Sequence, residues 1–177
     1  CLSIYHETDW FKPKSKKGVR KLVIHVPFQP EQLVVKDSLV DYQRYIRHVE
    51  RELKSHPKHQ ALLIHYSLGI GFLLENYGPD QKLLKKMKQS LEFLAQRKNR
   101  KVGYYETWAQ AMFALQKRQA QKSIELANLM RQRFTRGLSI PSYYIRSRGF
   151  ILTKKYEQAN EDINEVLEAH PNSPRAL

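Results

Sequence analysis

Apolar residues recur every three or four positions along most of this chain, and polar residues fill the positions between them. The first clear case begins at Asp37-Ser38, a pair whose side-chain oxygens suit the cap of a helix. Its apolar positions are Leu39, Tyr42, Tyr45, Ile46, Val49 and Leu53. This spacing is that of one face of an α-helix, so residues 38–55 are predicted to be helical, ending before Pro57.

Three later segments show the same spacing, and turn residues divide each segment near its middle. The segments are residues 59–96, 104–134 and 141–170. In the first of them, Gly78-Pro79 separates two runs of helical spacing, because these residues favour a turn over a helix. Each segment therefore predicts two helices joined by a turn, which is a helical hairpin.

The last segment has a distinctive order of residues. Its second half contains Tyr156, then Ala159, then an aliphatic pair, and it ends at Pro171. This order resembles the second helix of a tetratricopeptide repeat (TPR), a helix-turn-helix unit of about 34 residues. The first half departs from the TPR pattern, since Arg146 stands at a usually apolar position and Ser147 replaces the usual glycine.

The segment 59–96 resembles the first helix of a TPR through Leu68-Gly69 followed by Phe72. A glycine at this position is expected to let the paired helix approach closely, because it has no side chain.

The TPR resemblance implies an all-α fold of helical hairpins in a short right-handed superhelix, formed by residues 38–177. It also implies that the first helices of the hairpins make a concave face where peptides bind. The residues of this sequence predicted to lie on that face are Tyr66, Tyr105, Gln110, Tyr144 and Arg148. Tyrosine enrichment suits a recognition surface, although tyrosines also pack repeats together.

Residues 1–37 do not show the repeat pattern and are predicted to form an extended, basic N-terminal segment. Its basic residues are Lys12, Lys14, Lys16, Lys17, Arg20 and Lys21. Three interpretations stay open for them: contact with an anionic membrane, contact with nucleic acid, or a solvated loop. The aliphatic stretch 22–28 is expected to lie extended against the first helices.

The formal net charge of +14 and the pI near 9.9 allow nucleic acid, anionic lipid or an acidic protein as partner. Residues 151–177 hold five acidic and three basic residues, so the excess lies earlier in the chain. A second basic patch is predicted from Arg131, Arg133 and Arg136, which lie among aromatic residues. Such arginines can stack on bases, pair with a carboxylate, or form a solvated face.

Cys1 is the only cysteine, so no disulfide can form within the chain and a cysteine-based metal site is not expected. A processed chain with its single cysteine at residue 1 resembles a mature bacterial lipoprotein. That resemblance predicts a lipid anchor on Cys1 and a location in the cell envelope, facing the periplasm. The alternative is a fragment of a cytoplasmic protein. The sequence has no apolar run of the ~18–20 residues that a membrane span needs.

The motifs of common enzymes are missing from the sequence: it has no glycine-rich phosphate loop, HExxH or GxSxG. We therefore predict no enzymatic activity, no catalytic residues, no cofactor and no metal. His56 and His59 flank a helix break and are expected to be solvated, while His65 is expected to be a hydrogen-bonded packing residue. Glu106 is expected on an exposed position.

These features together predict a scaffold or adaptor that binds a protein or peptide within a larger assembly. Bacterial TPR lipoproteins commonly help to assemble or hold envelope machines such as pilus, secretion or motor complexes. The last hairpin of an array leaves one face that a partner or a second copy of the chain can cover, so a homo-oligomer is an open prediction. The alternative function is a helical-repeat module that binds nucleic acid through its basic surface.

Overall fold

The computed structural model describes residues 39–97, 102–133, 139–169 and 171, and every regular element within these ranges is an α-helix. The seven helices are α2 (Leu39–Ser55), α3 (Gln60–Tyr77), α4 (Gln81–Ala95), α5 (Tyr104–Gln116), α6 (Ala120–Arg133), α7 (Ser139–Leu152) and α8 (Tyr156–Ala169). The predicted all-α fold is confirmed. Cys1, the basic residues Lys12 to Lys21, the stretch 22–28 and Arg136 lie outside the described residues.

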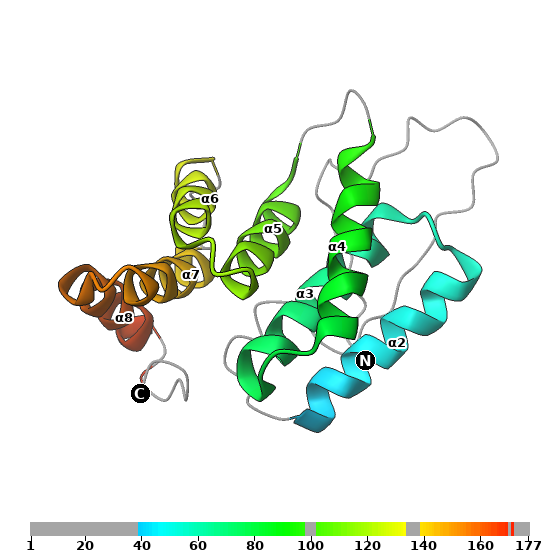
Figure 1. Cartoon of the computed structure of the whole chain (residues 1–177), viewed down its shortest axis with the longest axis horizontal. Coiled ribbons are helices and arrows are strands. Elements are labelled where there is room, and N and C mark those ends of the chain that lie inside the picture. The colour runs from blue at the N-terminus through cyan, green and yellow to red at the C-terminus, as the bar shows by residue number, and fades with distance from the viewer. Residues whose placement is uncertain (1–38, 98–101, 134–138, 170, 172–177) are drawn as a thin grey trace.

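The helices pack as a leading helix followed by three hairpins, as the sequence predicted. The hairpins are α3–α4, α5–α6 and α7–α8, and α2 packs on α3. The first helices follow one another, since α3 contacts α5 and α5 contacts α7. Figure 1 shows the result, with α2 at one end of the array and α8 at the other. The hand of the superhelix stays a prediction.

The turn between α3 and α4 is determined by two residues that the sequence singled out. Gly78 follows α3 with a φ of 91°, a left-handed conformation that glycine adopts readily. Asp80 then caps α4, because its Oδ1 accepts hydrogen bonds from the backbone N–H groups of Lys82 (2.8 Å) and Leu83 (3.1 Å). The chain therefore reverses within a few residues.

Helix α7 begins at Ser139, two residues before the predicted start at residue 141. Pro141 lies in the first turn, where the backbone N–H groups have no partner within the helix. The proline therefore fits inside the helix.

Aromatic rings connect α2, α3 and α5 at the centre of the core. The ring of Trp108 on α5 meets Phe72 on α3 edge to face, with centroids 5.5 Å apart. Phe72 in turn stacks on Tyr42 of α2 at 6.1 Å. All three side chains are fully buried, so one continuous apolar core passes from the leading helix into the second hairpin.

Two glycines allow close packing between helices. A Cβ atom at Gly69 would lie 2.8 Å from Cδ1 of Tyr45, which belongs to α2. The prediction that the paired helix approaches Gly69 is therefore wrong: the close neighbour is the preceding helix, because α2 covers this face of α3. A Cβ atom at Gly149 would lie 2.7 Å from Cγ1 of Ile124 and 2.9 Å from Oγ of Ser123, so α7 depends on glycine where it meets α6.

Candidate functional site

The five residues predicted to bind a partner all lie on the first helices, α3, α5 and α7. Their exposure differs widely. Tyr66 and Tyr144 are buried, and Tyr105 and Gln110 are half-buried. Arg148 alone of the five is exposed, with 48% of its side chain accessible to solvent. Arg148 is therefore the one of these residues that a partner reaches without displacing the packing.

Tyr66 joins the first three helices of the array. Its hydroxyl donates a hydrogen bond of 2.6 Å to Oε1 of Glu50 on α2. Nζ of Lys86 on α4 lies 3.0 Å from the same oxygen. Burial, and then the hydrogen bond to Glu50, raise the pKa of Tyr66 above its ordinary value. Its surroundings are therefore those of a packing residue.

Tyr105 belongs to a cluster of rings around His65. The hydroxyl of Tyr45 and Nδ1 of His65 are joined by a buried hydrogen bond of 2.5 Å. The His65 ring also lies near the ring of Tyr105, with centroids 6.2 Å apart. The prediction that His65 is a hydrogen-bonded packing residue is confirmed.

Gln110 contacts a carboxylate that the sequence did not indicate. Its Nε2 donates to Oε1 of Glu106 at 3.3 Å, and Glu106 is fully buried. The prediction of an exposed Glu106 is wrong. The reason is that α5 is contacted by α3, α4, α6 and α7, so this helix has little free surface.

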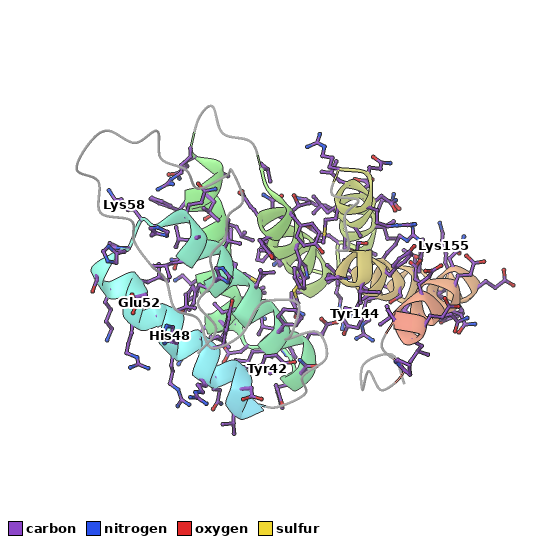
Figure 2. The ribbon with its side chains drawn as sticks, turned by 180° about the vertical axis from the view of Figure 1, so that it is seen from behind. Tyr42, His48, Glu52, Lys58, Tyr144 and Lys155 are labelled. Atoms are coloured by element: carbon purple, nitrogen blue, oxygen red, sulfur yellow. The ribbon has the colours of Figure 1, made fainter. Side chains whose placement is uncertain are left out.

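Arg148 is positioned by a buried carboxylate from another hairpin. Its Nε lies 3.3 Å from Oε1 of Glu75, whose side chain is only 7% exposed, and Tyr144 also hydrogen-bonds to Glu75. We call Glu75, Tyr144 and Arg148 the α3–α7 clasp; Figure 2 labels Tyr144 on the side of α7 toward α3. The clasp links the first hairpin directly to the third. In the packing of the first helices, α5 lies between α3 and α7.

The clasp leaves part of both charged groups available. Oε2 of Glu75 is buried without a hydrogen-bond partner among the described residues. Among the described residues, Glu75 is the only carboxylate that forms an ion pair with Arg148. The closest approach of the Arg148 guanidinium to Glu75 is through Nε, at 3.3 Å. A guanidinium has five N–H donors, so the exposed part of Arg148 has donors for a second carboxylate.

Glu75 should make stability depend on pH. Burial raises the pKa of Glu75 above its ordinary value of 4.5, and Arg148 and Tyr144 offset this only in part. The folded protein therefore holds the proton more tightly than the unfolded chain. Its contribution to stability is fully present below pH 4.5 and is lost as the pH rises through the folded-state pKa.

We therefore expect Glu75→Gln to become more stable relative to the wild type as the pH rises, by about 1.4 kcal/mol for each unit of pKa shift. Urea unfolding at a series of pH values, followed by circular dichroism, measures this difference. The matched control is Glu92→Gln, because Glu92 is well exposed and pairs with Lys88 on its own helix. Equal pH dependence in the two variants would contradict the assignment.

One arginine of the second predicted basic patch, Arg131, contacts another side chain of the fold. The guanidinium of Arg131 lies over the ring of Tyr143, 4.4 Å from its centroid, and Nη2 donates to the Tyr143 hydroxyl at 3.1 Å. Arg133 is exposed, and Arg136 lies outside the described residues. Only Arg133 is thus seen as an open charge of this patch.

Arg146, which departs from the TPR pattern, joins the last three helices. Its Nε and Nη2 donate to the two carboxylate oxygens of Asp162 on α8 at 2.7 and 2.5 Å. Its Nη1 donates to Oδ1 of Asn128 on α6 at 3.0 Å. Asp162 is almost completely buried. An arginine fits at position 146, which is usually apolar, because the buried carboxylate of Asp162 pairs with it.

A stripe of basic residues on α2 was not predicted. It consists of Arg44, Arg47, Arg51 and Lys54, which are all exposed. We call these residues the α2 basic stripe. They lie opposite the buried residues Tyr45 and Val49, and their spacing of three, four and three positions places them along one face of the helix. That spacing is visible in the sequence and was the available signal.

In residues 39–97, 102–133 and 139–169, no three histidine, cysteine, aspartate or glutamate side chains are grouped so that they could hold a metal ion. No helix of these ranges is long and apolar enough to cross a membrane. Burial lowers the pKa of His59, and nearby His56 and Arg97 add to this.

No protein-family model, curated protein or solved structure matches the chain. The fold itself defines the class, which is an all-α protein of stacked helical hairpins. Membership of the TPR family stays a prediction from the order of residues in the last hairpin.

Proposed function

We propose that this chain is a non-enzymatic scaffold whose helical hairpins hold a protein or peptide partner within a larger assembly. The observation that supports this most is Arg148 in the α3–α7 clasp. The side chain of Arg148, on the first helix α7, is about half exposed, and its contact with the buried Glu75 fixes its position. A side chain already held in place loses less conformational entropy when it binds a partner.

The chemistry of Arg148 indicates a partner with a carboxylate. Guanidinium groups bind carboxylates through two parallel hydrogen bonds, which give orientation as well as affinity. The carboxylate belongs to an acidic side chain or to the C-terminus of the partner peptide. The half-buried Tyr105 and Gln110 lie on the neighbouring first helix, α5.

The proposed setting is the bacterial envelope, with a lipid on Cys1 as anchor and the basic residues Lys12 to Lys21 near the headgroups. The support for this setting is the resemblance of the last hairpin to a tetratricopeptide repeat. An intact-mass measurement on protein purified from its native cells tests this setting. A mass increment of a diacylglyceryl or triacyl group on Cys1 is expected, and an unmodified cysteine would exclude the anchor.

A selection of displayed peptides on the immobilised full chain tests the scaffold function. We expect the enriched peptides to share a carboxylate at a fixed position, and to be lost with Arg148→Ala. The matched control is Arg133→Ala, which also removes one exposed arginine but lies on α6. The proposal fails if no peptide family is enriched, or if the same peptides bind Arg148→Ala.

The second candidate function is nucleic-acid binding. The observation that favours it is the α2 basic stripe, because a row of cations suits a phosphate backbone. Binding of this kind falls steeply with salt, since it releases counterions. The RNA measurement described below decides between this function and a different use of the stripe.

A further inference from the structure

The last helix of the described array carries a stripe of the opposite charge. Glu157, Glu161, Glu165 and Glu168 recur every three or four positions along α8, and all four are exposed. We call these residues the α8 acidic stripe. The buried residues Ala159, Asp162 and Val166 lie on the other side of the helix, where α8 packs on α7. The α8 acidic stripe therefore points away from the array.

The two stripes lie at opposite ends of the molecule. Helix α2 packs on α3 and helix α8 packs on α7, so each is an outer layer of the array. Figure 1 shows α2 and α8 at the two ends. In Figure 2, Tyr42, His48 and Glu52 mark α2 at one end, and Lys155 marks the turn before α8 at the other.

The stripes match in number, length and availability. Each has four charges, and at 1.5 Å per residue the α2 basic stripe spans about 15 Å and the α8 acidic stripe about 16 Å. No salt bridge joins a member of either stripe to another described residue, although the charge of Lys54 acts on Glu50 and that of Glu161 acts on Arg146. Lys86 and Lys88 on α4 differ in this respect, because they pair with Glu50 and Glu92.

We propose that copies of this chain associate head to tail, with the α8 acidic stripe of one copy lying along the α2 basic stripe of the next. The two surfaces are different, so the contact is not symmetric, and each added copy leaves one free stripe at each end. The assembly therefore grows with concentration instead of ending at a dimer. Neither stripe includes the α3–α7 clasp, so this proposal does not depend on the peptide-binding function.

The net charge of +14 makes two copies of the chain repel each other, but salt screens this repulsion over a short distance. At physiological ionic strength the Debye length is about 8 Å, so distant charges on two copies interact weakly. Charges in direct contact across the stripes are screened less. A nucleic acid would occupy the α2 basic stripe alone, whereas a second copy uses both stripes, and we therefore favour the second copy.

Sedimentation velocity of the full chain over a range of concentrations tests the proposal. Two salt conditions are compared, about 0.1 M and about 1 M, where the Debye length is about 10 and 3 Å. The α2 variant is Arg47→Glu with Arg51→Glu, and the α8 variant is Glu161→Lys with Glu165→Lys. These pairs change the formal charge of +14 by −4 and +4, so the combined variant keeps the charge of the wild type.

We expect the mean mass of the wild type to rise with concentration at low salt and to return to that of the monomer at high salt. The α2 variant and the α8 variant should each lose self-association, and the combined variant should regain it. The matched control is Lys82→Glu with Lys85→Glu, two exposed residues of α4 that also change the charge by −4. This control should behave as the wild type does.

Three outcomes would overturn the proposal. The first is a wild type that stays monomeric in both salts. The second is self-association that survives in the α8 variant, because the acidic stripe would then have no role. The third is a discrete symmetric dimer. If the monomeric wild type binds labelled homopolymeric RNA and the α2 variant does not, the α2 basic stripe belongs to nucleic-acid binding instead.

Discussion

Replacing Trp108 by alanine is expected to lower the free energy of unfolding by about 3–5 kcal/mol. Trp108 is 1% exposed and is the largest fully buried side chain of the described core. The centroid of its ring lies 5.5 Å from that of Phe72 on α3 and 6.0 Å from that of Tyr104 on its own helix. Alanine leaves a cavity between α3 and α5, and removes the ring contacts between two hairpins. Since a domain is stable by only about 5–15 kcal/mol, the loss is a large part of the total.

Urea unfolding followed by far-UV circular dichroism measures the effect of Trp108→Ala. The matched control is Tyr156→Ala, which also removes an aromatic ring, because Tyr156 is 64% exposed. This control should change the free energy of unfolding by about 0.5 kcal/mol or less. Similar losses in both variants would show that Trp108 does not hold the hairpins together.

Replacing Asp162 by alanine is expected to cost about 3 kcal/mol, the lower part of the range for breaking a buried ion pair. Asp162 is 2% exposed and accepts two hydrogen bonds from Arg146, whose side chain is 19% exposed. Without the carboxylate, the 3.0 Å bond to Asn128 is the only side-chain hydrogen bond that the guanidinium keeps to a described residue. The remaining access of Arg146 to water limits the loss.

A double-mutant cycle separates the ion pair from the packing around it. Asp162→Ala and Arg146→Ala should together cost clearly less than the sum of the two single variants, because the second change removes an already unpaired group. Glu161→Ala is the control, since Glu161 is the exposed neighbour of Asp162. Additive losses would mean that the bidentate contact contributes little.

Most of the helical architecture could be predicted from the sequence, because its signals are local. Apolar spacing of three and four residues depends only on the helix itself, and Gly78 ends α3 through its own backbone conformation. The four predicted segments therefore agree with the observed helices to within a few residues. The largest shift at the start of a segment is at α7, which begins at Ser139 where residue 141 was predicted.

The surroundings of individual side chains could not be predicted in the same way. Glu75 and Arg148 are 73 positions apart in the sequence, and no pattern indicates that their helices meet. Glu106 has an ordinary position on a helix and is buried only because other helices surround α5. Packing between helices thus decides which of the predicted surface residues remain available, and Arg148 is the main one that does.

The α3–α7 clasp also affects how the array opens. In a simple linear repeat, each hairpin contacts only its neighbours, and the end of the array frays without cost to the rest. Here Glu75 of the first hairpin holds Arg148 and Tyr144 of the third. Moving α7 away therefore also exposes a buried carboxylate of the first hairpin, Glu75 on α3. We therefore expect the backbone amides of α7 to exchange with solvent water in step with those of α3, as in a single cooperative unit.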